Sequence, residues 1–173
     1  MNVKKILVPT DFSEYSNEAL QYALMFLENS QGEIILLHVL PKAFEVYTTD
    51  IGSDEQLFRT REDETGLTGG VFTHHDYERR EIRRDLTEEA RVKLLDLVPI
   101  ASQKQVEIEI RVGEPYQEIL NIAQEQSVDM IVMGTHGRTG LSHLLMGSVA
   151  ERVVRQSTVP VMTLSPQFKS SLK

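Results

Sequence analysis

A short apolar run followed by glycines is the feature that most constrains how this chain folds. The run is Met130 to Met133, and the glycines that follow it are Gly134, Gly137, Gly140 and Gly147. Four consecutive apolar residues are typical of a strand that is covered on both faces, as in a parallel sheet. Glycine lets a ligand approach the backbone without meeting a Cβ atom. The stretch therefore predicts a buried strand that leads into a loop shaped around a ligand.

A helical pattern follows the last glycine and indicates the charge of that ligand. Val149, Val153 and Val154 form an apolar face at helical spacing. The first backbone N–H groups of a helix and its dipole favour a phosphate. The sequence therefore predicts an anionic ligand at this loop.

The rest of the chain alternates short apolar runs with helical patterns. Strands are expected at residues 3–8, 33–40, 106–112, 130–133 and 159–164. Helices are expected at residues 14–28, from 76 until Pro99 interrupts the pattern, in a short segment after Pro115, and after Gly147 up to about Ser157. The run Val106 to Val112 alternates apolar and charged residues, which predicts a strand at the edge of the sheet. Strands joined by helical crossovers predict an α/β fold, with a doubly wound parallel sheet and helices on both faces.

Residues 42–76 interrupt this alternation after the second strand. They have no steady period and few large apolar residues. Long irregular segments of this kind are uncommon and serve as lids, binding segments or disordered regions. A lid over the ligand, a dimer contact and plain disorder all remain open for this insertion.

Length and composition narrow the class of protein. A chain of 173 residues predicts a single domain, and its net charge of −8 argues against binding nucleic acid or anionic membranes. No apolar segment reaches the roughly 18 residues that span a bilayer, and the N-terminal apolar run stops at Pro9, so a strand is expected there rather than a signal peptide. The absence of cysteine excludes disulfides and is compatible with the cytoplasm, where we expect the protein to reside.

The glycine spacing carries a family resemblance. Gly134-x2-Gly137-x9-Gly147-Ser148, with Met133 before it and Val8-Pro9-Thr10-Asp11 near the N-terminus, resembles the ATP-binding branch of the universal stress protein family. Neither a Walker A loop nor a G-x-G-x-x-G motif after a strand is present. The resemblance implies a five-stranded, Rossmann-like sheet with the order 3-2-1-4-5. Ligands of such sheets lie where the strand order reverses, which here is between strands one and four.

The resemblance also implies a set of ligand contacts at the base end of a nucleotide. Asp11 and the backbone near Val39 would bind the adenine edge. Lining of the base and ribose is implied for Pro9, Thr10 and Met133. The implied ligand is ATP, or ADP or AMP, with Mg²⁺ as a candidate companion.

Other residues are implied at the ribose and phosphate end. Gly134 and Gly137 would let the chain pass close to the ribose and phosphates. Amides and a hydroxyl for the β- and γ-phosphates would come from Gly147, Ser148 and Val149. His136 and Arg138 would lie beside the phosphates. A homodimer through antiparallel pairing of Val159 to Leu164 is implied as well.

Several of these residues have a purely structural alternative. Ser148 to Glu151 reads S-x-x-E, the pattern of a capping box. Asp11 is one of several residues that could cap the first helix. His38 lies in an apolar strand, as expected of a core residue, and His74-His75 have no third ligand at a useful spacing for a metal.

Three functions compete at this point. The first is a regulatory module that binds ATP and changes its shape or partners. The second is a slow ATPase or self-phosphorylating enzyme, although the glycine loop offers no obvious general base and we assign no catalytic residue. The third is a nucleotide-free interaction scaffold, against which the intact glycine motif counts. The regulatory partner is not specified by any of these patterns.

Overall fold

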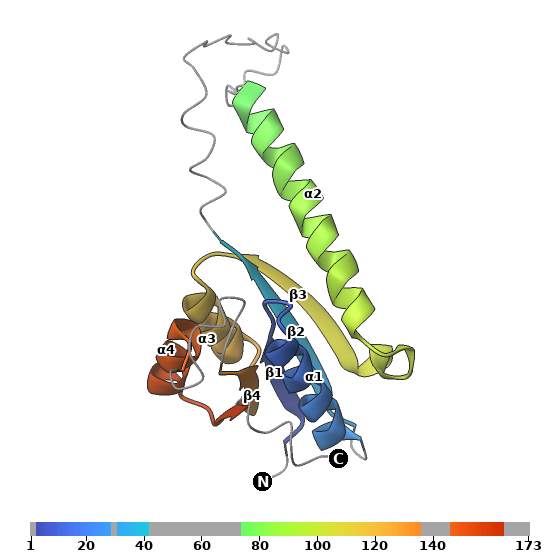
Figure 1. The fold of residues 1–173 in the computed structure, drawn as a ribbon, viewed down its shortest axis with the longest axis vertical. Helices are drawn as coiled ribbons and strands as arrows, with labels where there is room; N and C mark the ends of the chain where they lie inside the picture. Colours follow the sequence, from blue (N-terminus) through green and yellow to red (C-terminus); the bar gives the residue numbers. More distant parts are fainter. Residues whose placement is uncertain (1–2, 29–30, 42–73, 136–145, 165–173) are drawn as a thin grey trace, which may run out of the picture. The chain divides into compact units, whose positions relative to one another are not determined.

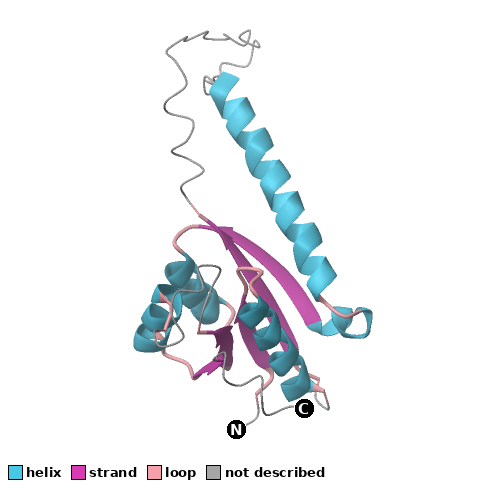
Figure 2. Ribbon diagram, viewed as in Figure 1, coloured by secondary structure: helices cyan, strands magenta, loops and turns pink. Residues whose placement is uncertain are grey.

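The fold is built on five parallel strands. The computed structural model describes residues 3–28, 31–41, 74–135 and 146–164. The strands are β1 (Lys5–Pro9), β2 (Glu33–Leu40), β3 (Val106–Val112), β4 (Met130–Gly134) and β5 (Val161–Leu164). They form a sheet with the order β3-β2-β1-β4-β5, and every neighbouring pair is parallel (Figure 2). The predicted sheet order and the edge position of β3 are confirmed.

Helices connect the strands, as the sequence predicts. They are α1 (Glu14–Leu27), α2 (His74–Leu97), α3 (Pro115–Glu125) and α4 (Ser148–Gln156), and a 3-10 helix, η2 (Ile100–Gln105), follows α2 (Figure 1). The sequence does not predict η2. Its N-cap is Pro99, which separates it from α2 as expected of a proline.

Element ends differ from the sequence expectations by a few residues. Strand β1 begins at Lys5 rather than Val3, and α2 begins at His74 rather than Asp76. Strand β5 begins at Val161 rather than Val159. Before it, Val159 is held in a turn, where its carbonyl oxygen accepts from Ser157 Oγ at 2.7 Å. These shifts do not alter the topology.

Two compact units make up the chain. One unit comprises residues 1–41 and 90–173, and the other comprises residues 42–89. The first contains the whole sheet and the last turns of α2. In the second, the structure describes only the beginning of α2, and the predicted insertion lies outside the described residues up to position 73.

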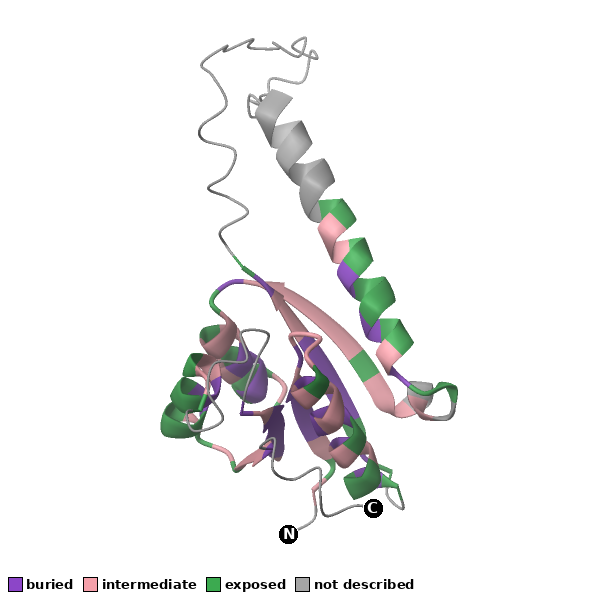
Figure 3. Ribbon diagram, viewed as in Figure 1, coloured by how far each residue is buried: buried purple, intermediate pink, exposed green. Residues whose placement is uncertain are grey.

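The alternation of side chains along the strands produces one core on each face of the sheet. Ile6, Val8 and Leu36 pack with α1 and with Leu94 of α2 on one face. Leu7, Ile35 and Leu37 pack with α3 and α4 on the other face. Strands β1, β2 and β4 are therefore buried on both sides (Figure 3). Each fully buried leucine or isoleucine stabilises the fold by roughly 1.5–3 kcal/mol.

The strand order places the reversal point between β1 and β4. From β1 the chain passes to β2 and β3 on one side, whereas β4 and β5 lie on the other. Because all strands run in the same direction, the segments after Pro9 and after Gly134 leave the sheet at the same edge. A ligand site is expected there. Among the described helices, none is long and apolar enough to cross a membrane.

Candidate functional site

A cavity of about 340 Å³ opens at the C-terminal ends of β1 and β4. This volume falls in the range of small-molecule pockets, about 300–1,000 Å³. Its walls come from the segment after β1, the end of β2, the starts of α3 and α4, and the end of β4. The lining residues are Pro9, Thr10, Asp11, Ser16, Leu37, His38, Val39, Pro115, Ile119, Met133, Gly134, Thr135, Gly147, Ser148, Val149 and Ala150.

Every predicted ligand-binding residue that the structure describes lines this cavity. These residues are Pro9, Thr10, Asp11, Val39, Met133, Gly134, Gly147, Ser148 and Val149. His136, Gly137 and Arg138 lie outside the described residues. Segments that are more than a hundred positions apart in the sequence thus line the same cavity.

Sequence reasoning missed part of the wall. Ser16, Pro115, Ile119 and Ala150 are helical residues whose position at the cavity depends on how α1, α3 and α4 pack. No local pattern indicates that packing. His38 had a signal, since it immediately precedes Val39 at the end of β2, but its apolar surroundings favoured a core position.

Hydrogen bonds fix the loop between β1 and α1. The Thr10 amide donates to Leu37 O at 2.8 Å, and the Phe12 amide donates to Thr10 Oγ1 at 3.0 Å. Asp11 Oδ1 accepts from the Ser13 amide at 3.1 Å. Thr10 Oγ1 and Ser16 Oγ are 2.9 Å apart in a buried pair. The loop that carries Asp11 is therefore held by hydrogen bonds within itself and to β2 and α1.

Ser13, and not Asp11, caps α1. Ser13 Oγ accepts from the Ser16 amide at 3.3 Å, and Ser13 is the N-cap residue. Asp11 lies two residues before the cap and binds the Ser13 amide. The alternative in which Asp11 is the helix cap is therefore wrong, and Asp11 is also one of the residues that line the cavity.

The capping-box alternative for Ser148 is also wrong. The N-cap of α4 is Gly147, which has no side chain, and Ser148 is already the first helical residue and is exposed. Glu151 reaches Arg155 at 3.5 Å instead of folding back onto the helix start. The first amides of α4 thus lie beside the cavity, at a helix terminus that no side chain of the described residues caps. Such amides can bind an anion.

The end of β2 offers backbone groups at the cavity. In β2 the residues whose amide and carbonyl groups face β1 are Glu33, Ile35, Leu37 and Val39, because Glu33 N donates to Lys4 O and Leu37 O accepts from Thr10 N. Strand β1 ends at Pro9, opposite Leu37. The pairing of β2 with β1 therefore ends before Val39, and the backbone amide and carbonyl groups of Val39 face the cavity side beyond the end of β1.

Gly134 has a packing reason to be glycine. A Cβ atom at this position would lie 2.9 Å from Tyr15 Cβ and 3.1 Å from the Tyr15 carbonyl carbon. The end of β4 therefore passes directly against the first turn of α1. This contact brings the two walls of the cavity together and does not depend on a ligand.

Comparisons with known proteins match this fold and motif. The sequence profile of the universal stress protein family matches residues 2–165 of the chain. The chain belongs to the universal stress protein family.

Relatives within this family resemble the chain over nearly its whole length. Universal stress protein MJ0577 of Methanocaldococcus jannaschii is 37% identical over 163 residues, which is 93% of this chain and 94% of that protein. Its solved structure superposes with a TM-score of 0.70, 31% identity, and coverage of 95% of this chain and 96% of that chain.

Two further solved structures share the fold at lower sequence identity. A universal stress protein in complex with cAMP has a TM-score of 0.52 and 18% identity, with coverage of 95% and 98% of the two chains. The universal stress protein of Archaeoglobus fulgidus in complex with dAMP has a TM-score of 0.50 and 19% identity, with coverage of 94% and 98%.

The cavity of this universal stress protein carries few charged groups. Among its described lining residues, only Asp11 and His38 are ionisable, and none is a lysine or arginine. Two arginines of α4 are directed elsewhere: Arg152 lies over the Tyr116 ring at 4.8 Å, and Arg155 pairs with Glu151. Attraction of an anion by the described wall must therefore come from backbone amides and the α4 dipole.

The described part of this family member contains no cluster of three histidine, cysteine or acidic side chains that could hold a metal ion. His74 and His75 form the start of α2, and their side chains lie outside the described residues, as does His143. Asp11 is the only carboxylate among the described lining residues. A divalent ion here would need most of its ligands from a bound polyphosphate and water.

Proposed function

We propose that this universal stress protein is a regulatory module that binds an adenine nucleotide, with ATP as the principal candidate, in the cavity between β1 and β4. One observation carries the proposal: the described residues of the glycine motif, Gly134, Gly147 and Ser148, and the Pro9-Thr10-Asp11 segment line the same cavity. Family members of the same fold have been solved in complex with cAMP and dAMP, which supports adenine nucleotides as the ligand class.

The base end of the nucleotide lies against Asp11 and Val39 in this proposal. The Asp11 carboxylate can only accept hydrogen bonds when ionised, and the adenine amine is a donor. Val39 presents backbone groups at the end of β2, beyond the last residue pair with β1. Apolar side chains such as Met133 and Ile119 enclose the base. A base whose edge complements a carboxylate and a peptide group fits this wall.

The phosphates lie at the start of α4. Ser148 and Val149 offer backbone amides at the start of α4, and exposed Ser148 adds a hydroxyl. The Gly147 amide donates to Thr135 O at 2.7 Å, so Gly147 contributes the absence of a side chain rather than a donor. Mg²⁺ would enter with the phosphates, because Asp11 is the only described carboxylate on the wall. Gly137, His136 and Arg138 complete this end of the site in the proposal.

The hydrogen bonds of the two ionisable residues on the described wall, Asp11 and His38, favour regulation over catalysis. Asp11 Oδ1 holds the Ser13 amide, and His38 Nδ1 lies 2.8 Å from Thr10 O. A general base must reach a water or an acceptor hydroxyl in the site. Both groups serve the loop backbone, so we expect turnover of ATP to be slow or absent.

Calorimetric titration tests the proposal. Nucleotide-stripped protein is titrated with ATP and Mg²⁺ beside a Gly147→Val variant and a Gln156→Val control on the exposed far end of α4. Gly147 has φ −59°, which valine can adopt, so the variant places a branched side chain at the cavity without requiring left-handed backbone. We expect saturable binding by the wild type and control, and at least tenfold weaker binding by Gly147→Val.

Two further readouts separate binding from its alternatives. Ligand at about 100 times its Kd should raise stability by about 2.7 kcal/mol, visible as a higher melting temperature. Release of phosphate measured in parallel reports turnover. No binding by the wild type would overturn the proposal and favour an interaction scaffold, while multiple turnovers at rates typical of enzymes would favour the ATPase alternative.

A further inference from the structure

We propose that His38 is a positioning residue, which holds the loop Thr10–Ser13 so that Asp11 selects adenine over bases that lack the exocyclic amine. This inference rests on the proposed nucleotide site. It concerns a residue that neither the sequence motif nor the cavity chemistry assigns to the ligand. It is based on the hydrogen bonds between β2 and the backbone of the loop.

Two consecutive residues of β2 bind the two backbone groups of Thr10. The Thr10 amide donates to Leu37 O at 2.8 Å, and the Thr10 carbonyl oxygen lies 2.8 Å from His38 Nδ1. A carbonyl oxygen can only accept, so Nδ1 carries the proton. These two hydrogen bonds, which join Thr10 to Leu37 and His38, fix the chain where it leaves β1, and Asp11 follows immediately. We call them the Thr10 clamp.

The hydroxyl groups beneath the loop complete the clamp. Ser16 Oγ donates to Ser13 O at 2.9 Å, so its single proton is used there. In the 2.9 Å pair with Thr10 Oγ1, the threonine must then be the donor. Thr10 Oγ1 in turn accepts from the Phe12 amide. Thr10 therefore serves the loop with its amide, carbonyl and hydroxyl, so it fixes the position of the loop.

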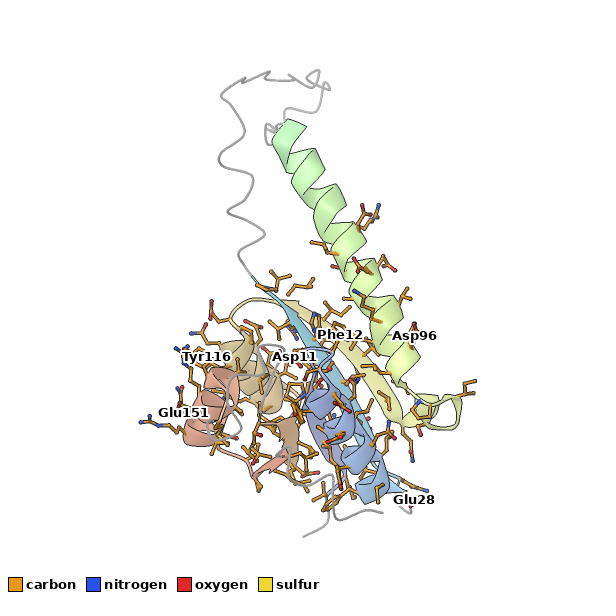
Figure 4. The ribbon with its side chains drawn as sticks, viewed as in Figure 1. Asp11, Phe12, Glu28, Asp96, Tyr116 and Glu151 are labelled. Carbon is orange, nitrogen blue, oxygen red and sulfur yellow. The ribbon has the colours of Figure 1, made fainter. Side chains whose placement is uncertain are left out.

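Phe12, the residue after Asp11, has an unusual backbone conformation. Its φ of 66° is left-handed, which a bulky residue rarely adopts. Phe12 packs against the core cluster that contains residues of α1, whereas Asp11 is one of the residues that line the cavity. Both residues are labelled in Figure 4. The centroids of the His38 and Phe12 rings are 4.4 Å apart. Lys93 of α2 places its Nζ atom 6.0 Å from the centroid of the Phe12 ring. His38 thus contacts the residues on both sides of Asp11, which are Thr10 and Phe12.

Base selectivity follows from this arrangement. A carboxylate held by its neighbours accepts from the adenine amine at little cost in ordering, whereas the hypoxanthine carbonyl at the same place would face it as a second acceptor. If the clamp is released, Asp11 loses its fixed direction and the discrimination falls. The phosphate end at α4 is not part of the clamp and should be unaffected.

Two substitutions at His38 separate the donor from the ring. His38→Phe keeps an aromatic ring against Phe12 and removes the donor, and His38→Asn keeps an N–H donor near the position of Nδ1. The probes are ATP and inosine triphosphate, with Kd measured by calorimetry. We expect the wild type to prefer ATP, His38→Phe to weaken ATP binding by about tenfold with little change for inosine triphosphate, and His38→Asn to retain most of the preference.

A double-mutant cycle with Asp11→Ala tests whether His38 affects ATP affinity through Asp11. If His38 acts through Asp11, His38→Phe should have no further effect on ATP affinity in the Asp11→Ala background. A general structural effect would weaken both nucleotides equally and would add to Asp11→Ala, which would overturn the inference while leaving the nucleotide site intact. Should His38→Phe not fold, His38→Gln, whose longer side chain moves the donor away from Nδ1, takes its place. Failure of the wild type to bind ATP would instead remove the proposed function.

Discussion

At the scale of single residues, Gly134 shows how packing and function can demand the same amino acid. The sequence pattern favours a ligand approach at this glycine, and the structure adds the contact with Tyr15. We predict that Gly134→Ala destabilises the protein by about 1–3 kcal/mol even without nucleotide, because backbone atoms and a Cβ atom must move apart. Urea unfolding of the ligand-free variant measures this difference.

Gly113→Ala is the matched control for Gly134→Ala. The three atoms nearest to a Cβ atom at Gly113 would all belong to the Glu118 side chain, with Oε1 at 2.7 Å. That flexible side chain can rotate away, so we expect a clearly smaller loss of stability. Equal losses for the two variants would show that the Tyr15 contact is not the reason for Gly134.

At the scale of elements, Asp129 joins the beginnings of two central strands. The pKa of Asp129 lies below its usual range because the amides of Lys4 and Lys5 donate to its carboxylate, at 2.8 and 2.9 Å. A carboxyl group whose pKa is lowered on folding stabilises the protein above its unfolded pKa of about 4, and this stabilisation is lost as the pH falls through the lowered value.

Asp129→Asn should therefore destabilise the protein most at neutral pH. We expect the difference in free energy of unfolding between wild type and variant to be constant from pH 7 to about pH 5 and to shrink below about pH 4. Urea unfolding at several pH values measures it, with Asp96→Asn at an exposed position of α2 as the control for removing one negative charge. A difference that does not change with pH would contradict the assignment.

At the scale of the whole molecule, β5 offers an edge for association. Ile131 N donates to the carbonyl oxygen of Pro160, just before β5, and Thr135 N donates to that of Leu164, so the backbone groups of Pro160 and Leu164 face β4. Because backbone groups alternate along a strand, Val161 and Thr163 direct theirs to the other side, where β5 is the last strand of the described sheet. The missing N–H of Pro160 therefore lies on the β4 side and leaves the outer edge intact.

The proposed homodimer would pair through this edge. We predict that Val161→Pro, which removes an outward donor, converts the dimer to a monomer, while Val161→Thr keeps the donor and the dimer. Light scattering gives the mass, and circular dichroism shows whether the fold survives. An unchanged mass for folded Val161→Pro would contradict pairing through β5.

The amino-acid sequence by itself determined the parallel sheet and the helices that connect its strands. Apolar runs and helical periods are local, so strands such as 33–40 could be read directly. The glycines indicated a loop around a ligand, and Gly134 and Gly147 both line the cavity. The family resemblance supplied the strand order, and with it the expectation that both ends of the chain meet.

Only the tertiary structure decided how individual groups are used. Ser148 reads as a helix cap by its local pattern, yet α4 begins at Ser148 itself with Gly147 as its cap. His38 reads as a core residue, yet it binds the Thr10 carbonyl and lines the cavity. Hydrogen bonds between residues distant in sequence, and a left-handed Phe12, depend on where β1, β2 and α1 meet. No local period encodes that meeting point, because it arises from packing the helices on both faces of the sheet.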